Sequence, residues 1–143
     1  ARHPGGARVN REHRQAVVDR LRPWRVTDDR ARYDDPDWPA PWVVIDWPPM
    51  RQESDRWEAH DRHRSVGTFA VSCVGEDSTQ ALALHDAVTE RLLNWRPDLA
   101  GWSTWPLHMD TAPRLLDPYR TAPDRVLVTV ATFWTWQANR VPT

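Results

Sequence analysis

Four residues with metal-binding side chains crowd into one charged stretch, "EAHDRH": Glu58, His60, Asp61 and His63. Zinc motifs place two histidines three or four residues apart on a helix and take a third ligand from elsewhere in the chain. His60 and His63 have this spacing, but helix formation is uncertain here, and no cysteine or second histidine pair supports them. The stretch therefore favours a solvated loop of paired charges, and we expect no metal ion.

A second chemical possibility lies in "FAVSCVGEDSTQ", where an apolar run meets one glycine and then a helical pattern. A phosphate cradle needs several glycines, whose backbone N–H groups converge on the anion, and usually a nearby cation. Here Gly75 stands alone and is followed by Glu76 and Asp77, whose charges repel phosphate. Asp77 or Ser78 is instead a good N-cap residue. We expect this turn to start a helix.

Nucleophilic catalysis has little support in the sequence. Ser65, Ser72 and Ser78 lack the sequence context of a nucleophile elbow. Cys73 lies inside an apolar run, where a thiol is expected to be buried rather than activated. We therefore expect neither an enzyme nor a cofactor.

The charged stretch 47–64 offers a different kind of site, because basic and aromatic residues are interleaved along it: Arg51, Arg56, Trp57, Arg62 and Arg64. Such interleaving occurs on nucleic-acid-binding surfaces. Acidic residues intervene, however, and leave the stretch close to neutral: Glu53, Asp55, Glu58 and Asp61. A mixture of Arg, Asp and Trp is typical of protein interfaces. We favour a protein interface here, with a nucleic-acid-associated or small-ligand domain as the alternative.

The overall composition gives no sign of a DNA-binding or membrane protein. The chain has 143 residues, with 19 basic residues, all of them arginine, against 20 acidic ones. No apolar run approaches the ~18 residues of a membrane span, and the first residues lack the apolar core of a secretory signal. Ten tryptophans are unusual, and large aromatics are enriched at protein interfaces. We expect a soluble, intracellular or particle-associated protein.

In the first half of the chain, we expect residues 1–7 to be flexible and residues 8–143 to form one domain. A helix is predicted from Asn10, which can cap it, to the neighbourhood of Pro23, which stops it. Residues 25–33 are compatible with a short edge strand or a loop. The β-branched run "WVVID", residues 42–46, predicts a buried strand.

The second half predicts a strand at 64–75, a helix from about Ser78 to Leu93, an edge strand broken by a bulge within 101–120, and a last strand at 124–140. One face of this last strand carries large apolar residues: Val126, Val128, Val130, Trp134 and Trp136. No alternating βαβ series occurs, so the sheet should be mainly antiparallel. We predict an α+β fold, a two-layer sandwich with both helices on one face of the sheet.

The order and texture of these segments resemble the tail terminator (tail completion) proteins of long-tailed bacteriophages, in particular those of actinobacterial phages and prophages. Five segments in sequence order carry the resemblance, which covers roughly residues 8 to 138: "REHRQAVVDRLRP", "PAPWVVID", "FAVSCVG", "DSTQALALHDAVTERLLNWRP" and "DRVLVTVATFWTW". The resemblance rests on this order and not on a sharp motif, so a neighbouring neck protein also fits it.

The resemblance implies an α+β subunit of a homo-hexameric ring in the neck region of the virion tail, assembled in the host cytoplasm. Such a ring caps the head-proximal end of the tail tube, stops tube polymerisation and meets the head–tail connector, and DNA only passes through its lumen. Its partners are thus other copies of the chain, the tail tube protein and the connector, with no membrane. A head–tail connector, neck or minor tail protein is the alternative within the same class.

We assign the contact residues of this expected ring as a hypothesis. The stretch 47–64 would touch a neighbouring subunit or the tube through Arg51, Arg56, Trp57, Arg62 and Arg64. Trp134 and Trp136, late on the last strand, would pack either in the core or at a subunit edge, and the sequence leaves both placements open.

Overall fold

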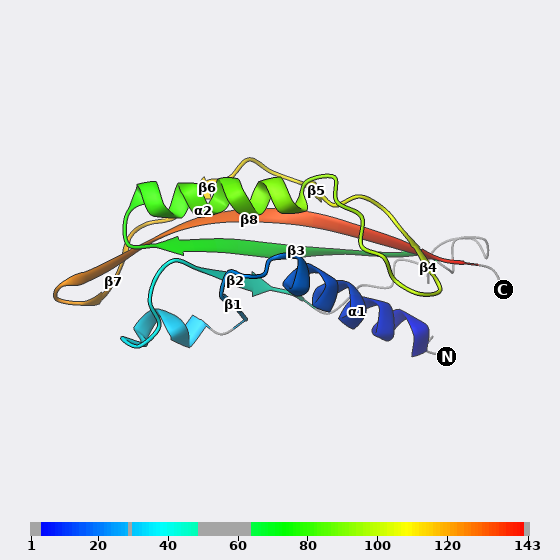
Figure 1. Cartoon of the computed structure of the whole chain (residues 1–143), viewed down its shortest axis with the longest axis horizontal. Helices are drawn as coiled ribbons and strands as arrows, with labels where there is room; N and C mark the ends of the chain where they lie inside the picture. Colours follow the sequence, from blue (N-terminus) through cyan, green and yellow to red (C-terminus); the bar gives the residue numbers. More distant parts are fainter. Residues whose placement is uncertain (1–3, 29, 49–63, 142–143) are drawn as a thin grey trace.

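The structure, a computed structural model, describes residues 4–28, 30–48 and 64–141. Its elements follow one another as α1 (Pro4–Arg20), β1 (Val26–Thr27), the 3₁₀ helix η1 (Arg30–Asp34), β2 (Trp42–Asp46), β3 (Arg64–Gly75), α2 (Ser78–Leu92), β4 (Trp102–Thr104), β5 (His108–Met109), β6 (Arg114–Leu115), β7 (Tyr119–Ala122) and β8 (Arg125–Arg140). One sheet is ordered β1-β2-β3-β8-β4, and β5, β6 and β7 also pair with β8 (Figure 1). The pairing is antiparallel except between β1 and β2.

The backbone of the sheet is a pair of long antiparallel strands, β3 and β8, which run across the molecule side by side (Figure 1). Their register pairs Phe69 with Trp134 and Cys73 with Val130. Phe69, Val71 and Cys73 are all buried on one face, as their alternation predicts. The predicted strands at 42–46 and 64–75 are confirmed at these bounds.

The predicted broken edge strand is confirmed as a series of short pieces along the outer side of β8. β4 pairs with the end of β8, and β5, β6 and β7 pair with successively earlier parts of it. Each of the three breaks between these pieces contains one proline, and so does the turn from β7 to β8: Pro106, Pro113, Pro118 and Pro123. Because proline has no backbone N–H, each one interrupts the ladder and leaves an edge that is hard to extend by another strand.

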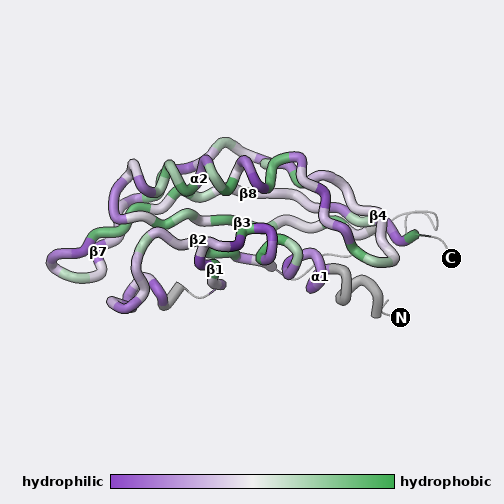
Figure 2. The backbone as a smooth tube through the Cα atoms, in the orientation of Figure 1, coloured by the Kyte–Doolittle hydropathy of each residue, from purple (hydrophilic) through white to green (hydrophobic). Residues whose placement is uncertain are grey.

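Helix α2 begins as the sequence predicts, with Asp77 as its N-cap. The Asp77 carboxylate accepts a hydrogen bond from the Gln80 backbone N–H at 2.7 Å. Gly75 is required just before it, since a Cβ there would lie 2.6 Å from the backbone N of Ala81. The hydrophilic and hydrophobic colours alternate along α2 in Figure 2, and its buried side chains lie on one stripe: Ala81, Leu84, His85, Val88 and Leu92.

Helix α1 is longer than predicted, and the expectation that Asn10 caps it is wrong. The helix begins at Pro4, six residues earlier, since proline suits the first turn of a helix. Asn10 lies inside it, and its side-chain oxygen accepts a hydrogen bond from Trp47 Nε1 at 2.7 Å. The helix ends at Arg20, before Pro23, as expected. The flexibility of residues 1–7 and the single domain at 8–143 stay predictions.

The α+β class and the mainly antiparallel sheet are confirmed, but a clear two-layer sandwich with both helices on one face is not seen. The sheet is curled (Figure 1), and its second face is also partly covered. The main core joins both helices to the sheet through Val17 and Leu21 of α1 and Leu84 and Val88 of α2. A second cluster on the other face buries Trp42, Val44, Val74 and Leu127 under the segment 33–40.

Candidate functional site

Most of the contact residues predicted from sequence lie outside the described residues. This holds for Arg51, Arg56, Trp57 and Arg62, and equally for Glu58, His60, Asp61 and His63 of the candidate metal stretch. Arg64 is the first residue of β3, and only its backbone is described. The interface hypothesis for residues 47–64 therefore stays a prediction.

Trp134 and Trp136 occupy the core, which is one of the two placements left open by the sequence. Their side chains are 0% and 1% exposed and belong to the main core cluster. The indole N–H of Trp134 donates to Thr132 Oγ1 at 2.8 Å. A side chain with no exposed surface reaches a neighbouring subunit only after rearrangement, so a direct interface role for these two residues stays untested.

Trp136 sits in an aromatic cluster that joins α1 to the sheet. Its ring lies 4.6 Å from that of His13 and 6.1 Å from that of Trp47, centroid to centroid. Trp47 stacks on Phe69 at 4.4 Å. On the opposite strand, Gly67 leaves room for the indole, since a Cβ there would lie 2.4 Å from Trp136 Nε1. Only glycine at this position allows the sheet to approach the ring so closely.

The two most strongly perturbed side chains in the core are poor catalysts. Burial lowers the pKa of His13 to about 4, so its imidazole is neutral at pH 7. Neither His13 nitrogen has a hydrogen-bond partner among the described residues. Burial also raises the pKa of the Cys73 thiol to about 12, which keeps it protonated. Both groups act as packing residues at neutral pH.

The C-terminal ends of α1 and α2 are joined by a reciprocal pair of arginines. Arg20 Nε donates to the Arg91 carbonyl at 3.1 Å, and Arg91 Nη1 donates to the carbonyls of Arg20 and Arg22 at 3.1 and 2.8 Å. Each guanidinium also lies over an indole: Arg20 over Trp95 at 5.3 Å and Arg91 over Trp24 at 4.9 Å. Cations are favourable at helix C-termini, where backbone carbonyls lack partners. This arrangement, the arginine clamp, fixes the angle between the two helices.

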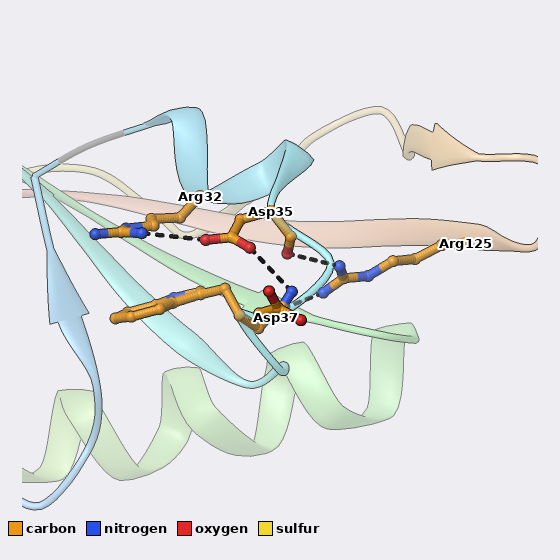
Figure 3. Close-up of polar contacts among 5 residues, drawn as sticks. Arg32, Asp35, Asp37 and Arg125 are labelled. Carbon is orange, nitrogen blue, oxygen red and sulfur yellow. Dashed lines mark hydrogen bonds and ion pairs between the residues drawn. The ribbon is translucent and has the colours of Figure 1, made fainter.

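One half of the sheet's second face is closed by the segment around η1, which an ionic network holds in place (Figure 3). Asp35 accepts from Arg32 at 3.1 Å and from the Asp37 backbone N–H at 2.9 Å. Arg125, at the start of β8, donates to the carbonyls of Asp35 and Trp38 at 3.0 and 2.8 Å. The Arg32 guanidinium also lies 4.7 Å from the Trp38 ring. The network holds this segment over Trp42.

The other half of this face, which we call the open half, has two large exposed aromatic side chains. Phe133 pairs with Ala70 and alternates with the buried Trp134, so it points away from the main core; it is 46% exposed. Trp105 donates its backbone N–H to the Gln137 carbonyl, follows the buried Thr104 and is 50% exposed. Strand alternation places Phe133 and Trp105 on the same side.

The centre of the open half is polar and ordered. The Thr135 hydroxyl donates to the Asp110 carboxylate at 2.6 Å, and His108 Nε2 lies 3.4 Å from the same carboxylate. The sequence contains one signal for this surface: Phe133 is a large apolar residue on the face of the last strand that also carries Thr129 and Thr135. Trp105 has no such signal, because its direction depends on the pairing of the broken edge with β8.

The described residues contain no group of three or more His, Cys, Asp or Glu placed to hold a metal ion. Over the same ranges, no helix combines the length and the apolar character needed to cross a membrane. The described surface instead has exposed apolar side chains on a sheet face whose edge is interrupted by prolines, and such side chains can bind another protein chain. We therefore treat the open half as the candidate functional surface.

Comparison with known proteins gives a match of fold. No protein-family model and no curated protein sequence matches the chain. A chain of the virion of a native gene transfer agent particle is similar in structure, with a TM-score of 0.55 and 16% sequence identity. The similarity covers 87% of this chain and 92% of that one, so it extends over nearly the whole fold of both.

Proposed function

We propose that this protein is a structural subunit of a phage-like virion and not an enzyme. The supporting observation is that its fold is shared, over nearly the full length of both chains, with a chain of a gene transfer agent virion. Folds host many functions, so the proposal also draws on the segment order that resembles tail terminator proteins. The half-exposed Phe133 and Trp105 are what a subunit that contacts other chains would present.

Within this class, the proposed role is that of the tail terminator. Six copies would form a ring on the head-proximal end of the tail tube, stop its polymerisation and present the surface that joins the head–tail connector. The chain would thus act in the neck region of the virion, and its partners would be its own copies, the tail tube protein and the connector. A ring requires head-to-tail contacts between two different patches of each subunit.

The test is the native mass of the purified protein, measured by light scattering over a concentration series with and without tail-tube subunits. A hexamer, or a ring that forms only on the tube, is the expected result. A ring that joins connector but never tube subunits would assign the chain to the connector side of the neck. A strict monomer that ignores both partners would contradict the proposal. In that case retention on heparin that falls steeply with salt would favour the nucleic-acid alternative.

A further inference from the structure

The open half differs from the usual water-facing side of an antiparallel sheet. Such a side normally carries polar residues. Here Thr68, Thr135 and Gln137 fit that pattern, but Phe133 and Trp105 stand about half exposed among them, and Ala70 and Val66 lie on the same side. Leu115 is also exposed, at 55%, but it pairs with Val130 and so points to the opposite side. The open half therefore combines a polar centre with two exposed aromatic rings, and aromatic side chains of this kind are enriched where one protein contacts another.

A second exposed apolar patch lies on α2. Leu82 lies in α2, and Leu93 is the residue that caps its C-terminal end; they are 44% and 45% exposed. Eleven residues is close to three helical turns, so the two leucines lie on the same side. Exposed Asp86 lies between them on that side, and exposed Glu90 lies beside it. We call Leu82, Asp86 and Leu93 the outward stripe of α2.

The two patches lie on opposite sides of the sheet. Helix α2 packs on the face that carries Val128 and Val130, through Ala81. Phe133, by strand alternation, points to the other face. Two different patches on opposite sides of one subunit allow a head-to-tail contact, whereas a two-fold dimer needs one patch that matches itself. Head-to-tail contacts build a ring when the rotation between neighbours closes and an open filament when it does not.

The distances between the exposed apolar side chains, and the charged side chains near them, are compatible with a contact between these two patches. Leu82 and Leu93 are about 16 Å apart along the helix axis. Phe133 and Trp105 are roughly 14 Å apart, from four residues along the strand and one strand across. Exposed His108 and Arg114 lie on the open-half side, where they can face Asp86 and Glu90. Two carboxylates also lie on the open-half side. Asp110 already accepts a hydrogen bond from Thr135, and Asp46, on β2, lies two strands away from Phe133 in the same row of the sheet.

We propose that the open half of one subunit packs on the outward stripe of α2 of the next copy of this chain. The inference rests on the proposed function, because it names the contact that would build the ring. The prolines of the broken edge favour this joining of faces, since they hinder extension of the sheet by a strand of the neighbour.

The experiment uses two variants, each of which spoils one patch and keeps the other. Phe133→Asp places a charge in the open half, and Leu82→Asp/Leu93→Asp places charges on the outward stripe. Under the conditions in which the wild type forms a ring, each variant alone should remain a monomer by native mass spectrometry. An equimolar mixture should give a 1:1 dimer whose population rises with concentration and no larger species, because only one pair of intact patches remains.

Leu115→Asp is the control for an added charge, since Leu115 is more exposed than any residue changed in the two variants and belongs to neither patch; it should leave the ring intact. Near-UV circular dichroism and the Tm report whether each variant is folded. If Phe133→Asp lowers the Tm, Phe133→Ser replaces it with the same expected outcomes.

Three results would overturn the inference while leaving the ring in place. The first is that Phe133→Asp assembles like the wild type. The second is that the two variants stay monomeric when they are mixed, at every concentration. The third is that Phe133→Asp forms a normal ring that no longer joins tail-tube subunits. The last result would assign the open half to the tube protein. A wild type that forms no ring, alone or on the tube, would instead count against the proposed function itself, which separates the two failures.

Discussion

Gly67→Ala is the sharpest perturbation of this fold, because the indole of Trp136 lies directly over the backbone at that point. A Cβ at position 67 would lie 2.4, 2.5 and 2.7 Å from three atoms of this ring. The ring is 1% exposed and is packed against His13, so it cannot simply rotate into solvent. Relief of the clash must move Trp136, α1 or the β3–β8 pairing.

The expected cost follows from two opposing effects. Overpacking of a closed core costs about 1–3 kcal/mol. Alanine in a strand recovers about 0.5–1 kcal/mol relative to glycine, through the entropy of the unfolded chain. The net expectation is a loss of about 1.5 kcal/mol in the free energy of unfolding, which for a domain of this size lowers the Tm by about 3–6 °C.

The assay is chemical denaturation followed by tryptophan fluorescence, with thermal melts as a second readout. Gly67→Ala should shift the denaturation midpoint and leave the m-value unchanged. Trp136→Phe in the same chain should recover part of the loss, since a smaller ring makes room for the methyl group, so the double variant is less destabilised than the sum of the singles. Gly101→Ala is the control. No atom lies within 4 Å of its Cβ, so it reports only the cost of its positive φ of 82°. Gly67→Ala within about 0.5 kcal/mol of the wild type would refute the reasoning.

Two further predictions concern the contacts of α1. The pKa of His13 is lowered to about 4 in the folded chain and is near 6.5 when unfolded, so the unfolded state binds more protons between these values. The contribution of neutral His13 to the free energy of unfolding should therefore be complete above pH 6.5 and fall by on the order of 3 kcal/mol as the pH drops to about 4. Urea titrations at a series of pH values should show this loss in the wild type, and His13→Phe should remove it. Arg91→Ala should lower stability by about 1–2 kcal/mol because it opens the arginine clamp, and Arg91→Lys should recover less than half of this, since an ammonium cannot bond two carbonyls and stack on Trp24 together. Arg91→Lys as stable as the wild type, or Arg91→Ala with no loss, would count against the clamp.

The sequence predicts best where one periodicity dominates. The run "WVVID" and the strand at 64–75 are correct at both ends, since β-branched and alternating residues leave few other solutions. Helix α2 is correct to one residue, because Asp77 caps it and its apolar stripe is regular. The broken edge strand was also predicted, from prolines that interrupt irregular apolar positions.

The predictions from sequence fail where the structure of a segment depends on contacts with residues far away in the chain. Asn10 has the right chemistry for a cap, but its side chain bonds to Trp47 across the fold while the helix begins earlier, at Pro4. The segment around η1 is charged and has no regular period, so nothing in it indicates that it covers Trp42. That cover depends on Arg125, ninety residues later than Asp35, whose carbonyl it holds.

The candidate surface was hidden from sequence reading for the same reason. The alternation of residues along the last strand places Trp134 and Trp136 on the same face, and both side chains are buried in the structure. Phe133 falls on the face that looks polar, and its exposure follows from η1 covering only one half of that face. The high number of tryptophans suggests an interface when only the sequence is read. Among the described residues, however, most tryptophan side chains lie in the core or pack against it, and Trp105 is the half-exposed exception.

One edge interrupted by prolines and an open sheet face suit the proposed ring for a physical reason. Pairing of strand edges between subunits does not set the number of subunits in an assembly, because each added strand exposes a new edge that can bind a further copy. A contact between a sheet face and a helix stripe fixes both the distance and the angle between neighbours, and when that angle closes a ring the number of subunits is fixed. Prolines at 106, 113, 118 and 123 hinder the first route, and Phe133 offers the second. A subunit that must end polymerisation needs this bias, because its own assembly has to stop.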